Sequence, residues 1–145
     1  YFFSLFLILS QYKLYFNMKI KSSQTLVSEA LENVKTISPK EALNLLNENK
    51  CNLIDIRDKN ELEKTGRIEN SHNISRGLLE FSIHPDSAFA QNQKLDTNKE
   101  IVLFCAAGGR SALAAKTLKE MGFEKVSHVE GGFGLMQNSG FKVIK

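Results

Sequence analysis

The stretch IVLFCAAGGRSALAAKTLKEMG, residues 101–122, decides the fold. It begins with four consecutive apolar residues, as expected for a strand that is buried on both faces of a parallel sheet. Alanine and leucine residues then recur at helical spacing from about Ser111 to Met121, and Gly122 is placed to end that helix. Cys105 stands alone in the short loop between this strand and this helix.

The same alternation of strand and helix extends to both sides of this stretch. CNLIDIRD (51–58) reads as a strand, and KNELEKTG (59–66) reads as a brief helix that Gly66 ends. KVSHVEGG (125–132) supplies another strand and turn, and FGLMQNSG (133–140) a closing helix. Strands that alternate with helices predict an α/β fold around a mainly parallel sheet with right-handed crossovers.

The remaining helices are predicted from caps and from a less regular middle segment. Ser38 is expected to cap a helix that begins at Pro39, with Glu41 closing a capping box. Between residues 67 and 98 we expect helical turns in GLLEFSI (77–83) and PDSAFAQNQ (85–93), joined by polar loops.

Length and composition limit the classes of protein and of partner. The 145 residues suit one core, and 19 basic and 16 acidic side chains are interspersed without a block of Lys and Arg that would bind a phosphate backbone. Nucleic acid is therefore not an expected partner. Cys51 and Cys105 stand far apart in a chain without extracellular features, which predicts reduced thiols and a cytoplasmic location.

The first residues, YFFSLFLILSQYKLYFN, differ in composition from the rest because they are apolar and aromatic, with Lys13 as the only charge. Their apolar run is too short to span a bilayer, and they lack the basic region and cleavage site of a secretory signal. Two interpretations stay open: Met18 is the true start, or these residues are a truncated signal or anchoring segment of a membrane-associated or exported protein. We divide the chain into an apolar extension (1–17), a leading segment (18–33) and a single domain (34–145).

The loop after Cys105 is suited to bind an anion. Ligands of open parallel sheets bind beyond the carboxyl ends of the strands, which is where Cys105 is placed. The helix N-terminus and Arg110 add positive potential, which favours the nucleophilic thiolate. A core cysteine before an ordinary Gly-Gly turn is the alternative, and it is the one we favour for Cys51. Four residues with almost no side-chain bulk let backbone N–H groups form a concave nest: Ala106, Ala107, Gly108 and Gly109.

With these motifs, the chain from about residue 36 to residue 144 resembles a single-domain rhodanese-like sulfurtransferase. FCAAGGRS resembles the active-site loop of that family, Cys-x-x-Gly-x-Arg, and VSHVEGG resembles its last strand with a double glycine. LIDIRDKNEL resembles its early strand, with Asp55, Arg57 and Glu61 at the matching positions. Two places depart from the family pattern: GRIENS (66–71) replaces Gly-His-Ile-Pro-Gly-Ala, and Met136 replaces a common tryptophan.

The resemblance implies a three-layer α/β/α fold with a five-stranded, mainly parallel central sheet. It also implies that Cys105 takes a sulfane sulfur from a donor such as thiosulfate and passes it from a persulfide to cyanide or a thiol, without a metal or organic cofactor. The N–H groups of residues 106–111 are candidates to hold the persulfide. Arg110 either binds the anionic donor or braces the loop through a carboxylate, and Ser111 is either a hydroxyl contact or, as we favour, simply the first helical residue.

Other polar residues receive weaker assignments. Arg76 either lines the pocket mouth and attracts thiosulfate or is a solvated surface arginine. Asp55 is expected to fix loop hydrogen bonds, and Arg57 to pair with Glu61 across a helical turn. The histidines at positions 72, 84 and 128 show no ligand spacing and no link to Cys105, so we assign them no catalytic or metal role.

Two other functions stay open. One is a persulfide relay or redox-sensing module that exchanges sulfur with a partner protein. The other is a phosphatase or arsenate reductase, because the fold resembles that of the dual-specificity phosphatases. Their loop is one residue longer between Cys and Arg than the four residues found here, so this shorter loop should hold a sulfur atom and exclude phosphate.

Overall fold

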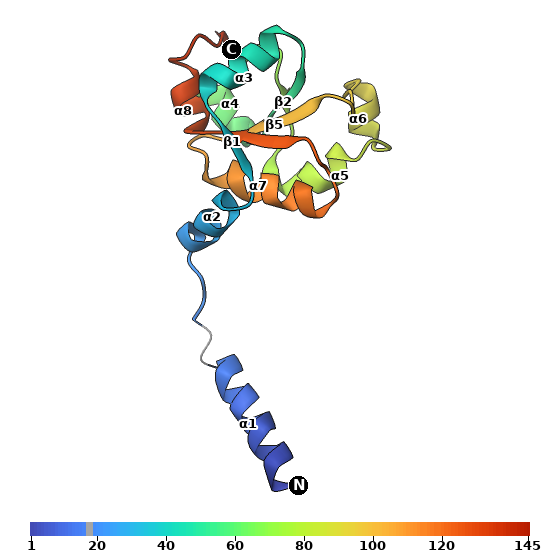
Figure 1. The fold of residues 1–145 in the computed structure, drawn as a ribbon. Coiled ribbons are helices and arrows are strands. Elements are labelled where there is room, and N and C mark those ends of the chain that lie inside the picture. The colour runs from blue at the N-terminus through green and yellow to red at the C-terminus, as the bar shows by residue number, and fades with distance from the viewer. Residues whose placement is uncertain (17–18) are drawn as a thin grey trace.

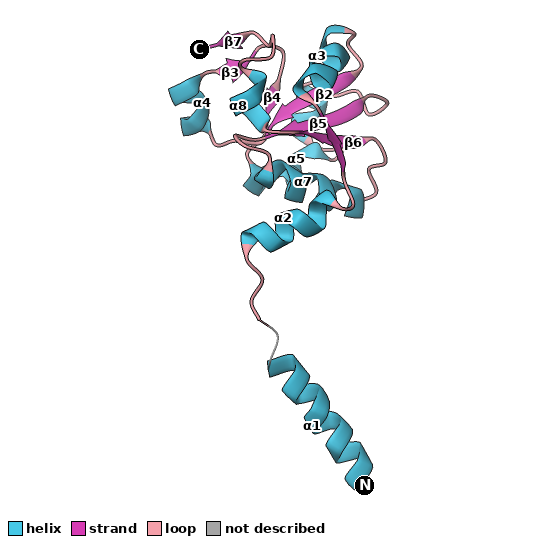
Figure 2. Ribbon diagram, turned by 60° about the vertical axis from the view of Figure 1, so that its left-hand side comes forward, coloured by secondary structure: helices cyan, strands magenta, loops and turns pink. Residues whose placement is uncertain are grey.

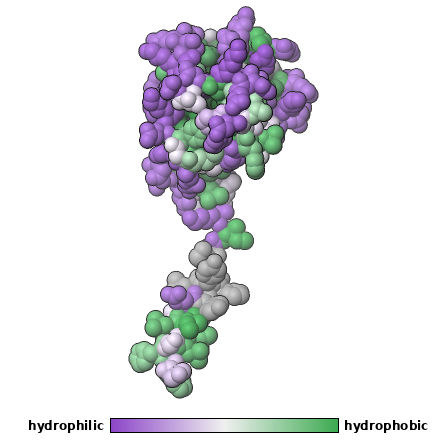
Figure 3. Space-filling model, turned by 90° about the vertical axis from the view of Figure 1, so that its right-hand side faces the viewer, coloured by the Kyte–Doolittle hydropathy of each residue, from purple (hydrophilic) through white to green (hydrophobic). Residues whose placement is uncertain are grey.

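The structure is a computed structural model that describes residues 1–16 and 19–145 (Figure 1). Helix α1 (Phe2–Phe16) carries exposed apolar side chains, including Phe2, Phe3 and Phe6. The described surface of this N-terminal helix is mainly hydrophobic in Figure 3. The expected boundary at Met18 lies outside the described residues. Within these residues, no helix has the length and the apolar character that crossing a bilayer requires.

The central sheet has five strands in the order β1-β6-β5-β2-β4, and every neighbouring pair is parallel. Strand β5 lies at its centre because the apolar run at 101–104 can be buried on both faces. Two further strands, β3 (Arg67–Ile68) and β7 (Val143–Ile144), form a small antiparallel sheet. The central strands are β1 (Lys35–Ile37), β2 (Cys51–Asp55), β4 (His72–Asn73), β5 (Glu100–Phe104) and β6 (Val126–Val129).

Helices cover both faces of this sheet, which confirms the expected three-layer α/β/α fold (Figure 2). One apolar core contains side chains of α5 (Leu79–Ile83) and α7 (Gly109–Glu120), with a partly buried side chain of α6 (Ala88–Asn92) packed against it. The other core contains side chains of α3 (Pro39–Asn47) and α8 (Gly132–Met136). Three short helices complete the fold: α2 (Ser23–Leu31), which packs against α7, α4 (Lys59–Thr65), and the 3-10 helix η1 (Arg76–Leu78).

The expected caps are present in part. The Ser38 hydroxyl accepts from the N–H of Glu41 at 3.1 Å, as predicted for the start of α3. Among the described contacts, the predicted bond back to the Glu41 side chain is not found at α3. A complete capping box is found at α4 instead, where Glu61 Oε2 accepts from the N–H of the N-cap residue Asp58 at 2.9 Å. The glutamate of α4 is therefore fixed at the helix start that faces the cysteine loop.

The two departures from the family pattern are accommodated by packing. Ile68 in the replaced segment is fully buried, and the Ser71 hydroxyl donates to its carbonyl at 2.6 Å, which closes the turn after β3. Met136, in place of the tryptophan, is fully buried in the core on the α3 and α8 side of the sheet. Both substitutions thus lie in packing and turn positions.

Candidate active site

Cys105 directly follows the central strand β5, at the carboxyl edge of the sheet, as the sequence predicts. Helix α7 begins at Gly109, two residues before the expected start at Ser111. The reason is Gly108, which takes the N-cap position with a φ of 106° that a residue with a side chain rarely adopts. The loop is therefore tight, and Arg110 and Ser111 both belong to the first turn of the helix.

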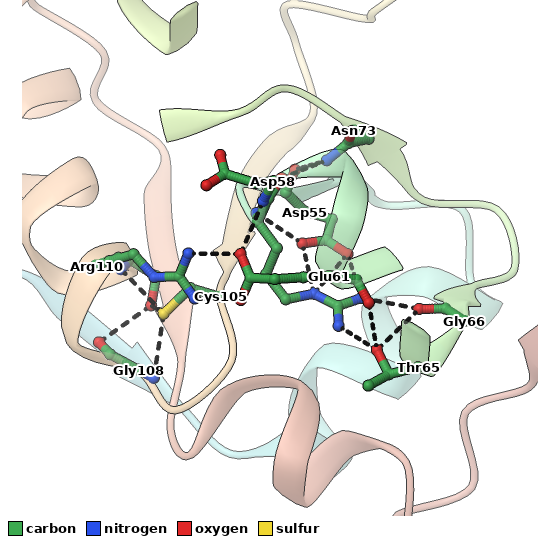
Figure 4. A network of polar contacts seen from close by, with 11 residues as sticks. Asp55, Asp58, Glu61, Thr65, Gly66, Asn73, Cys105, Gly108 and Arg110 are labelled. Atoms are coloured by element: carbon green, nitrogen blue, oxygen red, sulfur yellow. Dashed lines mark hydrogen bonds and ion pairs between the residues drawn. The ribbon is translucent and has the colours of Figure 1, made fainter. Parts of the chain in front are cut away.

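Backbone N–H groups of this turn point at the cysteine sulfur (Figure 4). The N–H of Gly108 lies 3.2 Å from Cys105 Sγ, and the N–H of Ser111 lies 3.4 Å from it. The Cys105 residue is only 1% exposed, so these donors act on the sulfur in surroundings that screen charge weakly. A helix N-terminus that directs two amides at one atom stabilises negative charge there.

Helix α8 supports the loop from the other side. The N–H of Phe133 donates to the carbonyl of Cys105 at 2.8 Å, and the N–H of Gly134 donates to that of Ala106 at 3.1 Å. Gly132 makes this approach possible, because a Cβ atom at that position would lie 2.3 Å from the Cys105 carbonyl oxygen. The second glycine of the double-glycine motif is thus required by the close contact between α8 and the loop.

Arg110 braces the loop against α4. Its Nη1 and Nη2 atoms donate to the two carboxylate oxygens of Glu61 at 2.9 and 2.8 Å (Figure 4). The hydrogen bonds from Arg110 lower the pKa of Glu61 to about 2, and the same pair raises the pKa of Arg110 above its usual range. Of the two roles left open for Arg110, the geometry shows the brace.

Asp55 and Arg57 form a buried bracket beneath the site, and the expected pairing of Arg57 with Glu61 is wrong. The Arg57 guanidinium donates to the Asp55 carboxylate, at 2.8 Å for the shortest contact, and lies 3.9 Å from the centroid of the Phe133 ring of α8. It also donates to Thr65 Oγ1 and to the Gly66 carbonyl, at the end of α4. Because Arg57 precedes α4, it does not share a helix face with the glutamate four residues later.

The guanidinium of Arg76 is held by other side chains. Its Nη1 lies 2.6 Å from Glu80 Oε1, and its Nη2 donates to Thr117 Oγ1 of α7 at 3.3 Å. The side chain is about one-third exposed. Attraction of an anionic substrate by Arg76 stays a prediction.

Ser111 and His128 connect the sulfur to the neighbouring strand, so the expectation that no histidine is linked to Cys105 is wrong. Ser111 is helical, as expected, yet its Oγ lies 3.6 Å from Cys105 Sγ and 3.1 Å from His128 Nδ1. The link depends on the register of two parallel strands, in which Leu103 of β5 pairs with His128 of β6. One sequence shows no pattern that specifies this register, so nothing in it indicates that His128 lies close to Ser111.

Cys51 has different surroundings from Cys105. It lies in the core on the opposite face of the sheet and is 7% exposed. Burial, with a smaller effect of Glu100, raises the pKa of the Cys51 thiol to about 11. Both cysteines are free thiols, and only Cys105 receives N–H donors from a helix N-terminus among the described contacts.

Several known proteins are similar to this chain in sequence. The curated relatives include a tRNA uridine(34) hydroxylase of Chlamydia trachomatis, 33% identical over 110 residues, which are 73% of this chain and 33% of the relative. A second such hydroxylase, of Anaplasma phagocytophilum, is 31% identical over 66% of this chain and 33% of its own length. This chain thus spans about a third of the length of these relatives.

Two solved structures are also similar. A protein of unknown function from Rhodopseudomonas palustris, described as a possible tyrosine phosphatase, is 35% identical with a TM-score of 0.76 over 88% of this chain and 98% of that one. The polysulfide-sulfur transferase homodimer of Wolinella succinogenes is 36% identical with a TM-score of 0.66 over 81% of this chain and 83% of that one. The sequence model of the rhodanese-like domain matches residues 38–138, and the chain therefore belongs to the rhodanese-like domain family.

Proposed function

We propose that this protein is a sulfurtransferase in which Cys105 carries a sulfane sulfur as a persulfide. The observation that carries the proposal is the position of Cys105 Sγ, which lies at the floor of a loop with two backbone N–H groups aimed at it. Membership of the rhodanese-like family and the similarity to a polysulfide-sulfur transferase support sulfur transfer at the level of the family.

The first half-reaction needs a thiolate and a good leaving group. The Cys105 thiolate attacks the outer sulfur of thiosulfate, a new S–S bond forms, and the bond to the sulfonate sulfur breaks with its electron pair leaving on sulfite. The persulfide keeps the negative charge on its terminal sulfur. No proton and no external oxidant or reductant is consumed.

The loop offers further donors for the terminal sulfur. The carbonyls of Cys105 and Ala106 point to α8, where the N–H groups of Phe133 and Gly134 bind them. Because trans peptide units place C=O and N–H on opposite sides, the N–H groups of Ala106 and Ala107 point away from α8. These two amides are available to the second sulfur as oxyanion-type donors.

The second half-reaction returns the enzyme to its starting state. Cyanide or the thiolate of an acceptor attacks the terminal sulfur, and Cys105 leaves as a thiolate. A small sulfur-containing anion and a thiophilic acceptor are therefore the proposed substrates. A partner protein that donates or accepts sulfur would use the same chemistry.

Hydrolysis of a phosphate ester is the second candidate, because one similar structure is described as a possible tyrosine phosphatase. Only four residues separate Cys105 from Arg110, and the Arg110 guanidinium is occupied by Glu61. A loop of this size is suited to one sulfur atom rather than to a tetrahedral phosphate. Release of nitrophenol from p-nitrophenyl phosphate would support the phosphatase and contradict the proposal.

The proposal is tested by intact mass measurement of the 145-residue protein after incubation with thiosulfate. We expect a gain of one sulfur atom that cyanide removes, that is absent in Cys105→Ser, and that persists in the matched control Cys51→Ser. A folded, reduced wild-type protein that gains no sulfur would refute thiosulfate as donor and favour a relay fed by a protein. Equal loss in both variants would refute the assignment of Cys105.

A further inference from the structure

His128 is a buried ionisable side chain that Ser111 connects to the proposed nucleophile, and the proposed sulfur transfer does not use it. The residue is 2% exposed and belongs to β6, and both of its ring nitrogens have partners. Its Nε2 lies 2.8 Å from Thr36 Oγ1, and its Nδ1 lies 3.1 Å from Ser111 Oγ. Burial lowers the pKa of His128, so the imidazole is neutral near pH 7 and has one donor and one acceptor nitrogen.

The sheet fixes the imidazole in this position. Thr36 of β1 and Leu103 of β5 are the direct neighbours of His128 in the two adjoining parallel strands. Leu103 and Cys105 belong to the same core, on the α7 face of the sheet. The ring therefore faces the first turn of α7, where Ser111 lies, and it has no need of a rotamer change to reach it.

The Ser111 hydroxyl has three polar neighbours and one proton to donate. Its Oγ lies 3.1 Å from the Gly108 carbonyl oxygen, 3.1 Å from His128 Nδ1 and 3.6 Å from Cys105 Sγ. While the sulfur carries a proton, the thiol donates to Ser111 Oγ and the hydroxyl donates to the Gly108 carbonyl. Once the sulfur is an anion, the thiol proton is gone, and the same hydroxyl proton can turn to the sulfur.

The hydroxyl proton can change its acceptor in this way only if Ser111 Oγ itself stays in place. We propose that His128 is a positioning residue, whose Nδ1–H donates to Ser111 Oγ and leaves the hydroxyl proton free for the anionic sulfur of Cys105. Because the Ser111 hydroxyl proton goes to the Gly108 carbonyl, Ser111 Oγ accepts from Nδ1–H, and in this tautomer Nε2 accepts the hydroxyl proton of Thr36. The inference deepens the proposed function, on which its relevance to the persulfide rests, but it applies equally to the thiolate.

The test compares two amides that mimic different ring nitrogens. The side-chain nitrogen of His128→Asn can occupy the place of Nδ1, whereas the longer side chain of His128→Gln reaches the place of Nε2 near Thr36. The readout is the rate of iodoacetamide alkylation at Cys105, measured by peptide mass at pH 7. We expect His128→Gln to slow alkylation about five- to tenfold, as the loss of a donor to a charged group would do, and His128→Asn to recover most of that loss.

A double mutant separates positioning from general damage. If His128 acts through the hydroxyl, then Ser111→Ala with His128→Gln is alkylated no more slowly than Ser111→Ala alone. Equal losses in the Asn and Gln variants, or losses that multiply in the double mutant, would overturn the inference. If the histidine variants unfold, Thr36→Val provides a second test, because Thr36 lies at an exposed position of β1. We expect this variant to slow alkylation of Cys105 about twofold. An unchanged rate would count against the inference.

The alkylation assay contains no sulfur donor, so the two proposals fail separately. A protein that takes up no sulfur from thiosulfate but shows the predicted alkylation pattern would refute the proposed function and leave the role of His128 intact. A protein that forms the persulfide without this alkylation pattern would leave the proposed function intact and refute the role of His128.

Discussion

Gly108 and Gly109 are adjacent glycines in the loop, and we predict that alanine has opposite effects on stability at the two positions. At Gly108 the φ of 106° places an alanine in the left-handed region, which costs ~1–2 kcal/mol, and its Cβ would lie 3.4 Å from the Gly131 nitrogen. At Gly109, within α7, the Cβ would meet only Val27 Cγ2 at 3.6 Å, an ordinary contact. Alanine there restricts the unfolded chain and stabilises the protein by ~0.4–1 kcal/mol.

The two variants should therefore differ by ~2 kcal/mol in the free energy of unfolding, by the sum of these two effects. Urea unfolding followed by circular dichroism measures the difference, and an unchanged m-value confirms that both variants unfold from the same compact state. Gly108→Ala should also slow persulfide formation, because the Gly108 N–H lies 3.2 Å from the sulfur. If Gly109→Ala destabilised the protein as much as Gly108→Ala, the assignment of the N-cap to Gly108 would be refuted.

Three further predictions concern single residues. The folded-state pKa of Glu61 is about 2 against an ordinary 4.5, so its ion pair stabilises the protein fully above pH 4.5 and is lost as the pH falls toward 2. Glu61→Gln should lower the free energy of unfolding by ~1 kcal/mol at pH 7, since the ion pair is partly exposed, and by less at pH 3. If wild type and variant differed by the same amount at both pH values, the ion pair with Arg110 would not be the cause. At pH 7.5, iodoacetamide should label Cys105 well before Cys51, whose thiol has a pKa of about 11, as peptide mass mapping would show; comparable labelling would contradict the assignment. Arg57→Leu leaves the buried carboxylate of Asp55 without its partner and should cost ~3–5 kcal/mol in urea unfolding, and a loss below ~1 kcal/mol would show that the bracket is not structural.

The layers of the fold were predictable because they depend on local patterns. The apolar run of β5, the capping serine of α3 and the helical spacing in α7 each specify an element without long-range information. Strands β1, β3, β4 and β7 were missed, since two or three residues with at most one buried side chain give no periodicity to detect.

The position of the cysteine loop was predictable from the sequence, and the contacts around it were less so. The spacing from Cys105 to Arg110 indicates an anion-binding loop, but the partner of Arg110 depends on where α4 lies in space. The sequence separation of four favoured a pairing of Arg57 with Glu61, whereas the buried Asp55 carboxylate is the nearer acceptor. Contacts between elements thus follow from packing, which a single sequence does not display.

The placement of the two cysteines has a consequence for oxidative damage. Cys51 pairs with Glu100 at one end of β2 and β5, while Cys105 follows the other end, roughly 16 Å further along the strand and on the opposite face of the sheet. A disulfide needs Cα atoms within about 7 Å, so these two thiols cannot join in the folded chain. A sulfenic acid formed at Cys105 must therefore be reduced by a thiol from outside these 145 residues, and the recovery of activity after peroxide depends on the external thiol supply rather than on the fold.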